Sequence, residues 1–216
     1  MENTKSNLEK SFERRLSILT LSEQQNIYGI PRFNMKERKH YFKLNNIEKD
    51  IFDNELKGSA SKIYFVLSLG YFKVSYQLFQ FNIDEVIEDA EYVANKYLPE
   101  IDVRAIDTSY GKRARLNHYS HILKLFSFRF ALDKDRASLI EKAKDILFID
   151  ANPKYIFKEL VRFSQDQKFI LPSYTTMQDI ISTAMVTQEK QLLTQLEELL
   201  DNDVRNQINA LLNKES

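Results

Sequence analysis

The sequence has no cysteine, which excludes a disulfide framework, a thiolate zinc site and a cysteine nucleophile. A chain without disulfides fits a reducing compartment best, so we predict a cytoplasmic protein. Glycine and proline are also rare, with four of each in 216 residues. Because sandwiches and barrels need frequent turns, this scarcity favours an all-α fold of long elements.

Long apolar runs are missing as well. No stretch approaches the roughly 18 uncharged apolar residues of a membrane span, and the N-terminus has no apolar signal-peptide core. We therefore predict no membrane partner.

Signatures of catalysis are equally scarce. The sequence contains no glycine-rich phosphate loop, nucleophile elbow or HExxH motif. His118 and His121 could share a helix face, but no acid at i+4 completes a ligand set, so we expect both, with His40, to be surface or DNA-facing. We expect no enzyme activity, no metal and no cofactor.

The charge is balanced, with 31 basic and 31 acidic residues, but it is unevenly distributed. Residues 1–45 carry nine basic and five acidic residues, and residues 112–129 carry five basic and none acidic. Residues 84–102 carry seven acidic residues against one lysine. Such segregation allows a neutral protein to orient on DNA, although a single charge run is more often a solvated helix face.

Apolar spacing and capping residues predict the helices. After a flexible arm over residues 1–13, we expect a helix capped by Ser22 and Gln25 that stops at Gly29-Ile30-Pro31. Asn45 or Asn46 caps the next, with Ile47, Ile51 and Phe52 on one side. Gly58 to Ser61 breaks the chain. We interpret residues 63–72, which are apolar almost all round, as a helix rather than a strand, because the elements that follow are helical.

The second half is also predicted to be helical. Asn82 caps a helix that ends before Pro99, and residues 102–111 form a hinge. The basic segment that follows is a helix whose inward face comprises Leu116, Tyr119, Ile122, Leu123 and Phe126. Further helices are expected near 136–149, 154–167 and 175–187, and then a closing pair carrying Leu192, Leu193, Leu196, Leu199, Leu200, Val204, Ile208, Leu211 and Leu212.

Seven stretches together resemble one family: Arg15–Leu21 with Tyr28–Phe33, His40–Leu44, Ser61–Lys73, Phe81–Tyr97, Arg113–Arg129, Ile170–Ser173 and the leucine-rich closing pair. Their order and spacing resemble the N-terminal region of the replicative class II transposases, the Tn-three family. The resemblance covers nearly the whole chain, from about Arg14 to Leu212.

The resemblance implies two helical DNA-binding subdomains that recognise the terminal inverted repeats of a transposon and help to hold the transposase dimer. We place the subdomains at residues 14–108 and 109–216, the second containing a helix-turn-helix-like element. The family's metal-dependent acidic triad lies beyond the matching region, so no catalysis is expected here. Two departures are Phe126-Ser127-Phe128-Arg129, where many members have Leu-Gly-Phe-Arg, and Ala114, where a threonine is frequent.

Arg113 and Arg115 are the first candidates for contacting DNA, because they begin a helix whose N-terminus itself favours phosphate. Lys112, His118 and Lys124 could widen the contact. Lys73 and Arg129 match basic positions of the family. For these two, internal ion pairs or packing over aromatic neighbours are an equal alternative.

Residues 155–186 are compatible with a helix, a turn and a second helix capped by Thr175 and Gln178. The first turn of the second helix would present polar side chains to DNA: Ser173, Thr175, Thr176 and Gln178. Capped helices after a proline turn are common in all-α proteins, so this element depends on the family resemblance.

The sequence thus predicts a non-catalytic region that binds double-stranded DNA at terminal inverted repeats, and it is compatible with self-association. A rival interpretation is a protein-interaction module that docks or dimerises through the leucine-rich pair at 192–212, without DNA binding.

Overall fold

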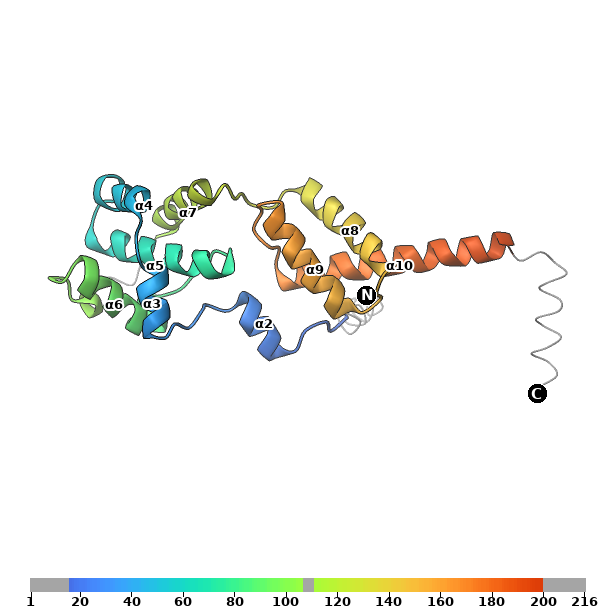
Figure 1. Ribbon diagram of the computed structural model, residues 1–216, viewed down its shortest axis with the longest axis horizontal. Helices are drawn as coiled ribbons and strands as arrows, with labels where there is room; N and C mark the ends of the chain where they lie inside the picture. The colour runs from blue at the N-terminus through green and yellow to red at the C-terminus, as the bar shows by residue number, and fades with distance from the viewer. Residues whose placement is uncertain (1–15, 107–110, 200–216) are drawn as a thin grey trace, which may run out of the picture. The chain divides into compact units, whose positions relative to one another are not determined.

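A computed structural model describes residues 16–106 and 111–199 (Figure 1). Across these residues the regular elements are all helical, and the β pairing consists of one isolated bridge between Arg129 and Phe169. The all-α prediction is confirmed. The predicted arm at 1–13, part of the predicted hinge, and the second half of the closing pair, with Leu200, Val204, Ile208, Leu211 and Leu212, lie outside the described residues.

The helices follow one another along the chain as α2 (Leu21–Tyr28), α3 (Met35–Tyr41), α4 (Asn46–Asp50), the π-helical turn η1 (Ile51–Glu55), α5 (Ser59–Ser75), the 3-10 turn η2 (Ile83–Val86), α6 (Ile87–Tyr97), the 3-10 turn η3 (Val103–Ala105), α7 (Lys112–Phe126), α8 (Asp133–Leu147), α9 (Pro153–Asp166) and α10 (Tyr174–Leu199). The expected helix ends before Gly29 and Pro99 are confirmed.

Two compact units make up the described chain, and each is assembled from separated segments. The α5 unit comprises residues 19–131 and 164–171, and the α10 unit comprises residues 16–18, 132–163 and 172–199. The basic helix α7 packs against α5 and therefore belongs to the α5 unit, whereas the predicted division at 108 assigns it to the second subdomain.

Helix α5 is the centre of its unit. Every residue from Ile63 to Phe72 is buried, so the helix has no solvated face over this stretch, as the apolar sequence predicts. Helices α3, α6 and α7 pack around it. The prediction of a helix here is confirmed. The predicted break at 58–61 is confined to Gly58, whose positive φ of 79° glycine adopts freely, because α5 already begins at Ser59.

Side-chain caps begin several helices, although one lies elsewhere than predicted. For α2 the cap is Thr20, not Ser22: the Glu23 N–H donates to Thr20 Oγ1 at 3.3 Å, and the Thr20 N–H donates to Glu23 Oε2 at 3.0 Å. The predicted cap at Asn45 is confirmed, with Glu48 as its reciprocal partner.

Two positions predicted to face inward are instead exposed. Ile47 is 67% exposed because α4 passes directly into the turn η1, whose Ile51 and Phe52 are the buried residues. Leu116 is 48% exposed, since α7 contacts the core through Tyr119, Ile122 and Leu123 farther along the helix.

Gly70 allows the ring of Phe42 to lie directly against α5. A Cβ at this position would overlap two ring carbons of Phe42, a fully buried side chain that contacts the rings of Phe33 and Tyr71. Alanine normally stabilises a helix by about 1 kcal/mol relative to glycine. Overpacking a core costs roughly 1–3 kcal/mol, occasionally more.

We expect Gly70→Ala to destabilise the protein by up to about 2 kcal/mol, measured by urea unfolding, because the overpacking cost exceeds the gain of about 1 kcal/mol in helix propensity. A matched control on the same helix is Ser68→Ala, which removes a buried hydroxyl that has no hydrogen-bond partner among the described residues. That variant should be neutral or stabilised. A stabilised Gly70→Ala variant would mean that α5 and Phe42 are not in close contact.

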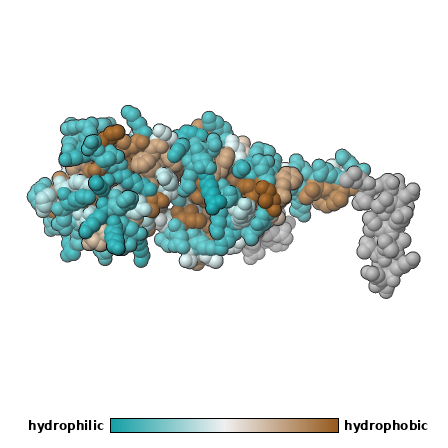
Figure 2. Space-filling model, in the orientation of Figure 1, coloured by the Kyte–Doolittle hydropathy of each residue, from teal (hydrophilic) through white to brown (hydrophobic). Residues whose placement is uncertain are grey.

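The α10 unit is a packing of α8, α9 and the first half of α10. Met177, Ile180, Ile181 and Ala184 of α10 are fully buried. From Glu189 to Glu198 every residue of the helix is exposed, and Leu192, Leu193 and Leu196 are 48%, 54% and 53% exposed (Figures 1 and 2). None of the described helices combines the length and apolar character needed to cross a bilayer.

Candidate nucleic-acid interface

The first turn of α7 is a cationic helix start. Lys112 and Arg113 are exposed and Arg115 is half-buried, with no acidic residue in this turn and no side-chain cap from Gly111. None of the three cations has an ion-pair partner among the described residues. Unpaired cations at the positive end of a 15-residue helix favour an anionic ligand.

His118, farther along α7, was predicted to lie at the surface, but the structure buries it. It is 1% exposed, its Nε2 lies 2.8 Å from Ser61 Oγ, and its ring meets the edge of Phe65. Burial, with a smaller contribution from the charge of His121, lowers the pKa of His118 to about 4. His118 is therefore a neutral core residue that joins α7 to α5, and Lys124 on the exposed side is the remaining candidate along the helix.

Lys73 makes the internal contacts that were the alternative to DNA binding. Its Nζ donates to Glu48 Oε2 at 2.8 Å and to the Lys43 carbonyl at 2.9 Å. Glu48 is buried, so the pair ties the end of α5 to α4. In the folded chain the Lys73 charge is already compensated.

Arg129 also has internal partners. Its guanidinium lies over the Phe169 ring at 5.5 Å and donates to the Phe130 carbonyl at 3.2 Å. Its backbone forms the isolated bridge, donating to Lys168 and accepting from Ile170. These contacts attach residues 168–170 to the end of α7.

The end of α7 has a left-handed backbone conformation. Ser127 ends α7 with a φ of 56°, in the left-handed region. Glycine reaches this region without strain, so a glycine would also suit the geometry at this position.

The polar residues before and within the start of α10 are divided between surface and interior. Ser173 and Thr175 are exposed and Thr176 is half-buried, and the Ser173 hydroxyl lies 3.0 Å from Thr175 Oγ1 and 2.9 Å from Thr176 Oγ1. The capping residue is Ser173, which accepts from the Thr176 N–H, rather than the predicted Thr175. Gln178 is buried and its amide donates to the Leu16 carbonyl, so it has a structural partner.

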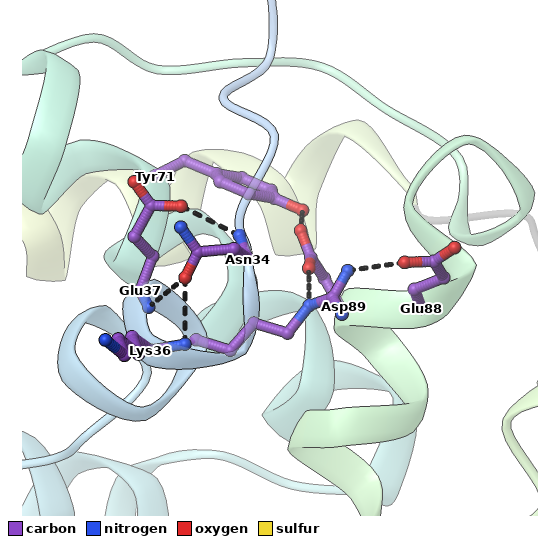
Figure 3. A network of polar contacts seen from close by, with 7 residues as sticks. Asn34, Lys36, Glu37, Tyr71, Glu88 and Asp89 are labelled. Carbon is purple, nitrogen blue, oxygen red and sulfur yellow. Dashed lines mark hydrogen bonds and ion pairs between the residues drawn. The ribbon is translucent and has the colours of Figure 1, made fainter.

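A buried polar network on α3 was not predicted from the sequence (Figure 3). Arg38 Nε donates to Asp89 Oδ1 at 2.6 Å, the Tyr71 hydroxyl donates to Asp89 Oδ2 at 2.7 Å, and Arg38 also pairs with Glu88. Burial, reinforced by the Asp89 charge, raises the pKa of Tyr71, and the hydrogen bond to Asp89 raises that of Arg38. The sequence contained one indication of this network. Asp89 is three residues from Val86, four from Val93 and adjacent to Ala90, so helical spacing places it beside an apolar face.

One protein family, described as a domain of unknown function (DUF4158), matches residues 18–184. The chain belongs to this family. No curated protein matches the chain. The DUF4158 match ends at Ala184, which is also where the buried face of α10 ends, so the exposed leucines lie outside the matched region. Within the described part of the chain, no group of three or more acidic or histidine side chains is arranged to hold a metal ion.

Proposed function

We propose that this DUF4158 chain is a non-catalytic DNA-binding region of a replicative transposase, which recognises the terminal inverted repeats of a transposon. The observation that carries the proposal is the cationic start of α7, where Lys112 and Arg113 are exposed, Arg115 is half-buried, and none of the three has an ion-pair partner among the described residues. Arg113 and Arg115 lie within Arg113–Arg129, one of the stretches that resemble the Tn-three family.

Phosphate binding is the chemistry that this helix start supports. Exposed lysine and arginine side chains gain affinity for DNA by releasing counterions from phosphates, and a helix N-terminus adds a favourable dipole. Such contacts position a protein on the duplex but do not read its sequence. Sequence selectivity would come from a second element, and the exposed hydroxyls of Ser173 and Thr175 at the start of α10 are the proposed source.

Fluorescence anisotropy tests the proposal directly. The full chain is titrated into a labelled duplex of the element's own terminal repeat and into a scrambled duplex of equal length, at about 50 and about 200 mM salt. Preferential binding to the repeat, weakened by salt, supports the proposal. If the protein binds neither duplex at low salt, the proposal is excluded.

Replacing Arg113 and Arg115 together by alanine should weaken binding to both duplexes about 10-fold or more. The slope of log K against log salt should flatten by roughly 2, since each phosphate contact contributes about 0.9. The matched control is Lys134→Ala with Arg136→Ala, which removes two exposed cations from the start of α8, where Asp133 and Asp135 lie alongside. If both pairs have the same effect, net charge rather than the α7 site governs binding.

The exposed leucines of α10 favour a second candidate, a protein-interaction module. Leu192, Leu193 and Leu196 share one side of the helix, in the stretch from Glu189 to Glu198 where every residue is exposed (Figure 2). Sedimentation velocity over a concentration series distinguishes the candidates. Self-association without any binding to the repeat duplex would favour this second function.

A further inference from the structure

Helix α3 carries a row of cations separate from the start of α7. Lys36, Lys39, His40 and Lys43 recur at intervals of three and four residues, which is the spacing of neighbours along one helical face. All four are exposed, Lys43 lying just past the end of α3. The row belongs to the α5 unit, as α7 does.

The acids near α3 are engaged elsewhere. Arg38, on the other side of the helix, binds Asp89 and Glu88, and the Glu37 carboxylate accepts from the Asn34 N–H at 2.7 Å. Figure 3 shows the Lys36 side chain pointing away from Asp89 and Glu88. The three lysines of the row have no ion pair with any residue in 16–106 or 111–199.

An uncompensated lysine row has a simple electrostatic consequence. Like charges at these helical spacings repel by a few tenths of a kcal/mol per pair, so a ligand with regularly spaced negative charges relieves the repulsion. The row extends over roughly 10 Å, about the axial rise of three nucleotides of one DNA strand. One strand of a duplex presents about three phosphates over this length.

A shallow hollow adjoins one end of the row. It has a volume of about 600 Å³, and its lining includes His40, Lys43 and Asn45 together with Leu125 and Phe126 of α7. Its acid, Glu48, is paired with Lys73. The hollow leaves the cationic side chains accessible and adds no free carboxylate beside them.

We propose that Lys36, Lys39 and Lys43 bind backbone phosphates of duplex DNA and form a second contact surface of the α5 unit. This inference rests on the proposed function and extends it to residues outside the start of α7. Lysine acts as a point charge rather than a bidentate fork, so the α3 row orients the duplex without reading bases.

The test is the same anisotropy titration with a Lys36→Ala, Lys39→Ala, Lys43→Ala variant. We expect it to bind the repeat and the scrambled duplexes at least about 10-fold more weakly, with the salt slope flatter by about 2–3. The matched control replaces Lys49, Lys57 and Lys96, three exposed lysines of the same unit outside the row, and should retain more of the affinity and slope. Thermal melting checks that both variants are folded, and Lys39→Glu offers a single substitution with an effect in the same direction.

The outcomes separate the two proposals. If the wild-type protein binds repeat DNA and the folded α3 variant keeps the same affinity and salt slope, the proposed α3 contact surface is wrong. The proposed function then remains intact. Equal losses in the variant and the lysine control also overturn the α3 surface. Wild-type protein that binds neither duplex overturns both proposals.

Discussion

An Arg38→Ala variant is expected to lose about 3–5 kcal/mol of unfolding free energy, the cost of removing one partner from a buried ion pair. Asp89 is 5% exposed, and Arg38 is its charged partner at 2.6 Å. Without the guanidinium, the carboxylate would keep the Tyr71 hydrogen bond but would remain a buried, uncompensated charge. Chemical denaturation monitored by circular dichroism measures the loss.

Arg104→Ala provides the matched control. Arg104 pairs with Glu91 at 3.1 Å, but its side chain is 76% exposed, and surface pairs contribute about 0–1 kcal/mol. Combining Arg38→Ala with Asp89→Asn should recover part of the loss, because the amide removes the buried charge. An Arg38→Ala variant no less stable than Arg104→Ala would show that Asp89 is not buried as described.

Acid should destabilise the folded chain through His118. Its pKa is about 4 in the folded state and about 6.5 in an unfolded chain, so between these values the unfolded state binds more protons. Stability is therefore retained above pH 6.5 and lost as the pH falls toward 4, by at most about 3 kcal/mol from this group. Urea unfolding at a series of pH values measures the curve.

Carboxylates also titrate in acid, so the informative quantity is the difference between the wild type and His118→Gln. The glutamine cannot take up a proton, yet it can still hydrogen-bond to Ser61. We expect the variant to lose less stability than the wild type between pH 6.5 and 4. If the stability of the two proteins falls equally between pH 6.5 and 4, His118 is not buried and is instead exposed to solvent.

Local sequence patterns predicted most helices because their signals are short in range. Asn45 with Glu48 lies within one turn, and the apolar run from Ile63 to Phe72 excludes a solvated helix face. The misplaced cap of α2 has the same origin: Ser22 and Thr20 both begin capping patterns, and only the structure shows that Thr20 is used.

The candidate site was harder to predict because exposure depends on distant residues. His118 and Arg113 lie on one basic helix, yet Ser61 and Phe65, far away in sequence, bury His118 and leave Arg113 exposed. Lys73 finds Glu48 in the same way. Helical periodicity gives the relative faces of such residues, but not which neighbouring helix covers them.

The bridge between Arg129 and Phe169 has a consequence for synthesis of the chain. The α5 unit includes residues 164–171, which leave the ribosome only after the whole of α8 and most of α9. Its last segment therefore docks late, and the buried ring of Phe169 reaches its place against Arg129 only after this intervening chain has been made. Residues 16–18 are made first, but their contact with Gln178 forms only after α10 has been synthesised. Neither unit can therefore be completed before the other has been largely translated.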